Sequence, residues 1–102
     1  MKVYFLPPAV LELEDACKWY ELQKPELGRE FLDEIEAAIR RIVSWPKSAG
    51  RIGEGLHRCL LRRFPYGLIY GIDIDKVVIV AVAHLHRKPF YWTGRRGWAS
   101  FS

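Results

Sequence analysis

The chain has 102 residues, half of them hydrophobic, and carries a formal net charge of +4. A chain of this length forms one domain with one core, and its longest apolar run falls far short of the roughly 20 residues of a bilayer-spanning helix. With no signal-peptide pattern, it is expected to be a soluble, cytoplasmic protein without a membrane partner. Residues 1–45 hold six Lys/Arg against nine Asp/Glu, whereas residues 46–102 hold ten against three. A polyanionic partner should therefore meet the C-terminal half first.

A short strand and two helices are predicted for the N-terminal half. Residues 3–6 are β-branched or aromatic, and Pro7-Pro8 then suits the first turn of a helix. Apolar side chains recur at helical spacing in residues 9–22 and again in residues 26–43. The short break between these segments predicts an antiparallel helical hairpin. The inner face of the first helix is expected to hold Val10, Leu13, Ala16, Cys17 and Tyr20.

Three strands are predicted after a glycine-rich linker at residues 47–55. Residues 56–64 alternate imperfectly and place Phe64 on the face of Leu56. The next strand covers residues 66–73, and a last strand, apolar on both faces, runs from Val77 to about Arg87. The N-terminal strand must pair with one sheet edge. The predicted fold is therefore α+β, with a three-stranded antiparallel meander packed on the helical hairpin.

Neither the cysteines nor the histidines predict a metal or cofactor site. Cys17 and Cys59 show no ligand or disulfide spacing and are expected to be small core residues. His84 and His86 share a strand face, but no cysteine or carboxylate lies near them in sequence. His84 also shares its predicted face with Val80, so we expect a partly buried histidine at a strand end. No cofactor and no metal are predicted.

Two motifs combine with this element order. Residues 62–70 read Arg-Arg-Phe-Pro-Tyr-Gly-Leu-Ile-Tyr, and residues 81–92 read Ala-Val-Ala-His-Leu-His-Arg-Lys-Pro-Phe-Tyr-Trp. From residue 3 to residue 92 the chain resembles the RelE/ParE superfamily of type II toxins, which has arginine before Pro-Tyr and an apolar strand ending in Val-x-His. The resemblance implies a toxin that a cognate antitoxin neutralises. The toxin would then reach operator DNA only through that antitoxin.

The superfamily contains two mechanisms. RelE-like members cut messenger RNA on the ribosome, whereas ParE-like members bind DNA gyrase and need no chemistry of their own. An RNase must activate a 2′-OH, stabilise charge on phosphorus and protonate the leaving oxygen. The candidates for that alternative are Arg58, Arg62, His84 and Tyr91. The linker offers only Lys47 and Arg51 in place of the lysine pair of RelE-like enzymes, and Leu85 stands where they have an arginine. The prediction is a non-enzymatic, ParE-like toxin, with an inactive relative retained as a binding module as a third alternative.

A basic, aromatic edge in the last third of the chain is the predicted docking surface. The predicted partner-binding residues are Arg62, Arg63, Tyr66, Arg87 and Tyr91. Strand alternation sends one of Arg62 and Arg63 to solvent and the other towards the acidic helices, so one of them is expected to be structural. Arg95 and Arg96 are interpreted as part of a basic tail for an acidic peptide or nucleic acid, and Trp92 as a residue packed over the sheet.

Overall fold

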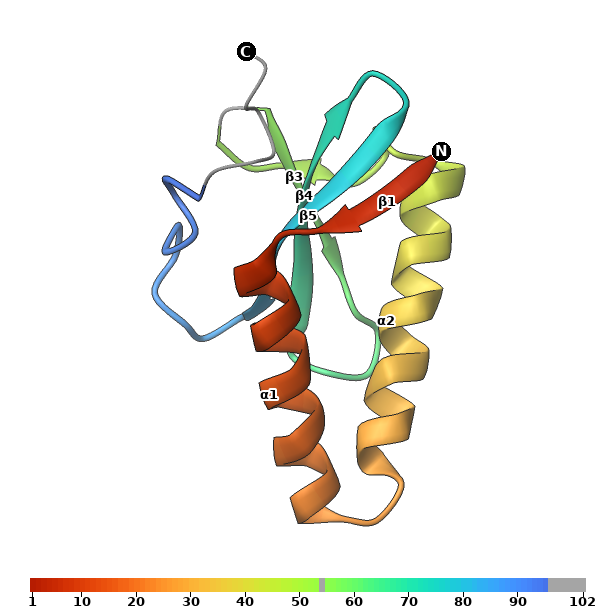
Figure 1. Ribbon diagram of the computed structural model, residues 1–102, viewed down its shortest axis with the longest axis vertical. Helices are drawn as coiled ribbons and strands as arrows, with labels where there is room; N and C mark the ends of the chain where they lie inside the picture. The colour runs from red at the N-terminus through yellow and green to blue at the C-terminus, as the bar shows by residue number, and fades with distance from the viewer. Residues whose placement is uncertain (54, 96–102) are drawn as a thin grey trace.

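The computed structural model describes residues 1–53 and 55–95, in which a helical hairpin covers one face of a five-stranded sheet (Figure 1). The elements in chain order are β1 (Lys2–Phe5), α1 (Pro7–Gln23), α2 (Leu27–Ser44), β2 (Gly50–Arg51), β3 (Leu56–Leu60), β4 (Tyr66–Asp73) and β5 (Lys76–His84). The predicted α+β architecture is confirmed. Among the described residues, neither helix combines the length and the hydrophobicity that a membrane crossing requires.

The strand order in the sheet is β1-β5-β4-β3-β2. The predicted meander of β3, β4 and β5 is antiparallel, and β1 joins its β5 edge in parallel, from Lys2 opposite Lys76 to Phe5 opposite Ile79. The linker contains a strand that the prediction missed. This strand, β2, is only two residues long and pairs with His57 and Arg58 of β3.

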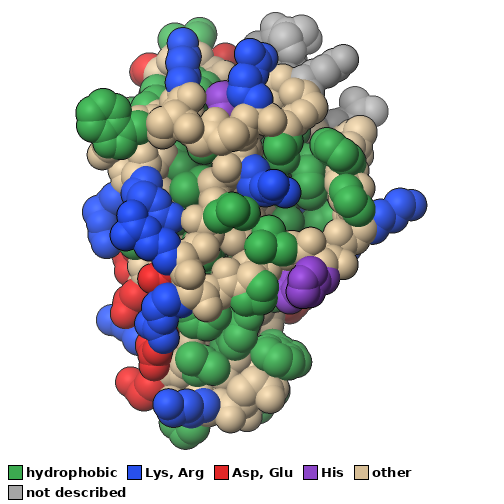
Figure 2. Space-filling model, turned by 180° about the vertical axis from the view of Figure 1, so that it is seen from behind, with side chains coloured by type: hydrophobic (Ala, Val, Ile, Leu, Met, Phe, Trp, Pro, Cys, Tyr) green, Lys and Arg blue, Asp and Glu red, His purple; other side chains and the backbone are tan. Residues whose placement is uncertain are grey.

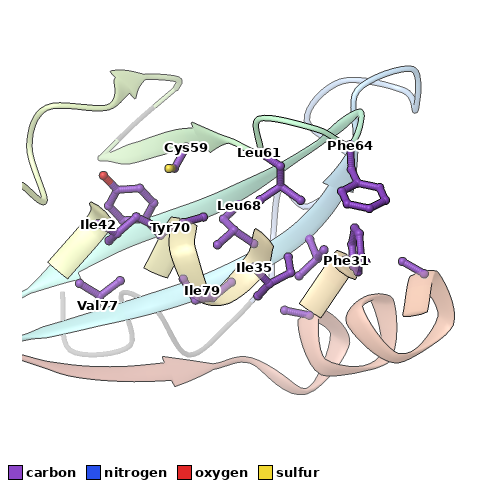
Figure 3. Packing of buried hydrophobic residues seen from close by; sticks show 14 residues of the cluster. Phe31, Ile35, Ile42, Cys59, Leu61, Phe64, Leu68, Tyr70, Val77 and Ile79 are labelled. Atoms are coloured by element: carbon purple, nitrogen blue, oxygen red, sulfur yellow. The ribbon is translucent and has the colours of Figure 1, made fainter. Parts of the chain in front are cut away.

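The main core lies between the hairpin and the sheet (Figure 3). Apolar residues of α2 recur every three or four positions, so they form one stripe that packs on β4 and β5. Its most buried members are Phe31, Ile35, Ala38 and Ile42. Tyr70 of β4 is fully buried, and its hydroxyl donates to the Pro46 carbonyl oxygen at 2.6 Å. The core thus also fixes the start of the linker.

The first helix packs through small residues. Ala9 and Ala16 are buried, whereas Val10 is exposed, so the prediction that Val10 faces the core is wrong. Small side chains bring α1 close to the sheet. The helix keeps apolar side chains on its outer surface as well, where Leu11, Trp19 and Leu22 are exposed.

A second, smaller core covers the opposite face of the sheet. Residues 85–95 fold back over this face, where Trp92 packs with Ile69, Val78 and Val80. Trp92 is only 6% exposed, which confirms the prediction that it packs over the sheet.

A β-bulge corrects the predicted position of His84. Tyr70 pairs with Ile79 and Ile69 pairs with Ala81, so Val80 is an extra residue in β5. The bulge reverses the alternation beyond it. His84 consequently lies on the helix-covered face, opposite Tyr66, and does not share a face with Val80 as predicted.

Two strands are shorter than predicted. β3 ends at Leu60. The Leu61 N–H still donates to the Tyr66 carbonyl oxygen, but the N–H groups of Arg62 and Arg63 donate to the Glu34 carboxylate of α2. The chain then turns, and Phe64 is buried on the helix-covered face, contrary to the face predicted for it. β5 ends at His84, three residues before the predicted end.

Candidate functional site

A cluster of charged side chains joins α1 to the C-terminal segment. Arg95 donates to both carboxylate oxygens of Glu12, at 2.9 and 2.8 Å, and also to the Val80 carbonyl oxygen at 2.8 Å. The Val82 N–H donates to Glu12 at 2.9 Å, and Arg87 approaches it at 3.4 Å. The side chains of Glu12 and Arg95 are only 13% and 17% exposed. Burial acts to raise the pKa of Glu12, but the hydrogen bonds and the positive charge of Arg95 outweigh it and hold this pKa below its usual range.

The cluster completes the edge of β5 at the point where β1 ends. β1 pairs with β5 only as far as Ile79, so no strand among the described residues lies beside the backbone of Val80 and Val82 on that side. Buried backbone groups need hydrogen-bond partners, and here Arg95 supplies the donor and Glu12 the acceptor. Two side chains therefore replace a strand, and they hold residues 85–95 against the sheet.

Tyr91 lies inside this cluster. The Arg87 guanidinium carbon is 3.7 Å from the centroid of the Tyr91 ring, and that of Arg95 is 5.1 Å from it. The hydroxyl is buried close to Glu12, yet no described residue offers it a hydrogen bond of acceptable geometry. Burial, followed by the Glu12 carboxylate, raises the pKa of Tyr91 far above its usual value. Such a phenol is a poor proton donor.

Arg62 and Arg63 occupy the connection between β3 and β4. The Arg63 side chain forms an ion pair with Glu30 at 2.5 Å, whereas the Arg62 side chain is exposed and pairs with no described acidic residue. Alternation predicted this division, with one arginine on the acidic helix and one facing solvent. Arg63 therefore holds the β3–β4 connection on α2, and Arg62 is open to a partner.

Arg58 and His84 come from opposite faces of the sheet but meet at the end of the strands. The stem of Arg58 crosses Gly67, where a Cβ atom would lie 3.1 Å from Arg58 Cγ. Both residues border a small hollow of about 100 Å³, together with Arg87. Arg62 and Tyr91 do not line it, so the structure brings together only two of the four residues named for an RNase.

Two larger grooves flank the hairpin. One, of about 530 Å³, lies between α1 and the ends of β4 and β5, where the rings of Trp19, Tyr20, Tyr66 and His84 line it. Burial raises the pKa of Tyr66 there. The other, of about 600 Å³, lies between α2 and β3 and is bordered by arginines. Apolar grooves with a few polar groups suit the side chains of a protein partner.

The predictions missed Glu12 and Arg95 as a pair. Arg95 was interpreted as part of a basic tail, and no local signal connects it to Glu12, 83 positions away in the sequence. Arg96 of the same tail lies outside the described residues. In the part of the chain that the structure describes, no three His, Cys, Asp or Glu side chains are grouped as metal ligands.

Comparison with known proteins places the chain in a family. The family model described as ParE toxin of type II toxin-antitoxin system, parDE, matches residues 3–89. A solved structure titled "Chromosomal ParDE TA system from P. aeruginosa" has the same fold, with a TM-score of 0.73 at 18% sequence identity over 83% of this chain and 96% of that chain. No curated protein matches the sequence significantly. Because the family model spans most of the chain, this protein belongs to the ParE toxins of type II toxin-antitoxin systems.

Proposed function

We propose that the protein arrests growth by binding DNA gyrase and that a cognate antitoxin neutralises it. Family membership and the likeness to a ParDE system support the antitoxin. The antitoxin would also be the only route by which this chain reaches operator DNA. The gyrase target rests on the ParE-like character of the chain, which needs a binding surface rather than an assembled set of catalytic groups.

The observation that carries the choice of mechanism is the environment of Tyr91. A general acid must reach the leaving oxygen and release its proton readily. The Tyr91 hydroxyl is buried beside Glu12, with its pKa raised by burial and by that carboxylate. It does not line the hollow that Arg58 and His84 share. A catalytic role for Tyr91 would require residues 85–95 to move so that its hydroxyl could reach a bound phosphate.

The outer surface of α1 supports a protein partner. Leu22 is 84% exposed, and Leu11 and Trp19 are also exposed on the same helix. Trp19 borders the aromatic groove between α1 and the strand ends. Exposed apolar residues next to a groove are typical of a surface that another protein covers.

The two mechanisms are separated by inducing the toxin without its antitoxin. We expect DNA cleavage complexes of gyrase, an SOS response and filamentation, while messages stay intact. Purified toxin should also inhibit supercoiling by purified gyrase. Rapid cleavage of messages that is abolished by Tyr91→Phe and by Arg62→Ala would instead establish a ribosome-dependent RNase.

The RNase is retained as the second candidate because Arg58, His84 and Arg87 border one hollow. Growth without arrest on induction would contradict both mechanisms. It would favour an inactive relative that serves only as a binding module.

A further inference from the structure

The groove between α2 and β3 combines an apolar floor with a charged rim. Its volume is about 600 Å³, and Ile42, Cys59 and Tyr70 form its floor. Trp45 and Leu60 stand at its border and are 70% and 48% exposed. Large apolar side chains so close to an apolar floor leave a surface that a protein side chain would cover favourably.

Every charged side chain that lines this groove is an arginine. Arg41 and Arg62 contribute to its wall, Arg58 borders it from the face of β3 opposite the hairpin, and none of the three forms an ion pair with a described Asp or Glu. Arg41 is held in place, because its Nη2 donates to the Leu60 carbonyl oxygen at 2.9 Å. A guanidinium so anchored still has free N–H donors for a carboxylate.

The edge of β3 is closed to an added strand. β2 already pairs with His57 and Arg58, and Arg41 occupies the carbonyl oxygen of Leu60. The Glu34 carboxylate accepts hydrogen bonds from the backbone N–H groups of Arg62 and Arg63. A partner chain therefore cannot pair with β3 as an added strand, so it must contact the groove through its side chains.

We propose that this groove binds a short acidic segment of the antitoxin. One aliphatic or aromatic side chain of that segment enters the floor beside Trp45, and neighbouring carboxylates pair with Arg41, Arg58 and Arg62. The inference rests on the proposed function, because it assigns to the antitoxin a site on this chain. The three arginines are the reason that the antitoxin segment should be acidic, and the apolar floor is the reason that it should carry an apolar side chain.

A nucleic acid fits this surface less well. Figure 2 shows Lys and Arg side chains gathered on the edge along which α2 runs, with Asp and Glu side chains directly below them. The helix itself carries Glu30, Asp33, Glu34 and Glu36. A duplex needs a basic surface that follows several phosphates, whereas this one is short and ends against carboxylates.

The test measures the affinity of the purified toxin for the antitoxin encoded beside it, by isothermal titration calorimetry. We expect Arg58→Glu and Arg62→Glu each to weaken binding about tenfold and the double variant about a hundredfold. Trp45→Ala should weaken binding about tenfold without changing the net charge. Lys2→Glu is the matched control, because it makes the same charge change at an exposed residue of β1, far across the sheet from β3, and should leave the affinity unchanged. Circular dichroism checks that each variant is folded.

Each outcome separates this inference from the proposed function. Equal affinity of the wild type and the folded double variant would overturn the inference and leave the toxin-antitoxin assignment intact. A wild-type chain that does not bind the antitoxin would overturn both. If the double variant keeps its affinity for the antitoxin but loses binding of a DNA duplex that the wild type shows, the groove is a nucleic-acid site and the inference is wrong.

Discussion

Replacing Glu12 by Gln tests whether one carboxylate holds the C-terminal segment on the fold. The amide keeps the size of the side chain but removes its charge and one acceptor oxygen. Arg95, only 17% exposed, would then lack its counter-ion, and its donors and the Val82 N–H would compete for one oxygen. Removing one partner of a buried pair costs about 3–5 kcal/mol, and the remaining amide acceptor offsets part of this. We expect the free energy of unfolding to fall by about 2–3 kcal/mol.

The effect should depend on pH in a defined direction. The pKa of Glu12 in the folded protein lies below the ordinary value of 4.5, so folding favours the ionised form. Its stabilisation is complete above the unfolded pKa and is lost as the pH falls through the folded pKa. The difference between wild type and Glu12→Gln should thus be constant from about pH 6 upward and shrink in acid.

Urea unfolding followed by circular dichroism measures this difference. In thermal unfolding, a loss of about 2–3 kcal/mol corresponds to a fall of roughly 10–20 °C in Tm. Glu14→Gln is the matched control, because Glu14 is exposed on the same helix. Hydrogen exchange should rise in residues 85–95 of the Glu12→Gln protein. A stability equal to that of Glu14→Gln would refute the role assigned to the carboxylate.

Four further substitutions, one of them a control, test local features by the same unfolding assay. Ile74 is 91% exposed in the β4–β5 turn and has a φ of 54°, a left-handed conformation that β-branched residues avoid. Asparagine adopts this conformation more readily, so Ile74→Asn should stabilise the protein by about 1 kcal/mol, and a decrease in stability would contradict this. A Cβ atom at Gly28 would lie 2.8 Å from the Cys17 carbonyl oxygen, so Gly28→Ala should destabilise the protein by about 1–3 kcal/mol. Gly50 has open space around it, so the control Gly50→Ala should change the stability by less than about 0.5 kcal/mol. Tyr91→Phe removes a buried hydroxyl without a partner and should be neutral or stabilising by up to about 1 kcal/mol, and a clear loss would reveal a hydrogen bond to Glu12.

Local patterns predicted the elements that local forces decide. The second helix shows one apolar stripe, and β4 lies between Pro65 and the turn, so its predicted range of 66–73 agrees with the observed Tyr66–Asp73. Features that depend on residues far apart in the sequence could not be predicted from local patterns. β2 exists only through its pairing with β3, and β3 ends where Glu34 of α2 takes its backbone donors.

The bulge in β5 was hidden for a different reason. Residues 77–83 are apolar on both faces, so their sequence carries no alternation from which a change of phase could be detected. One extra residue at Val80 is enough to move His84 to the other face of the sheet. A histidine at the end of a wholly apolar strand therefore cannot be assigned to a face from its spacing alone.

The pairing of charges explains why the docking surface that we propose differs from the one predicted from the sequence. The sequence locates an excess of positive charge in the C-terminal half but does not say which of its arginines are already bound within the protein. Arg63 is engaged by Glu30, and Arg87 and Arg95 are engaged by Glu12. Arg62 remains without an acidic partner among the described residues, and Arg41 and Arg58 join it around the groove between α2 and β3. A partner that seeks positive charge should therefore bind at this edge, whereas Glu12 and Arg95 hold residues 85–95 against the sheet.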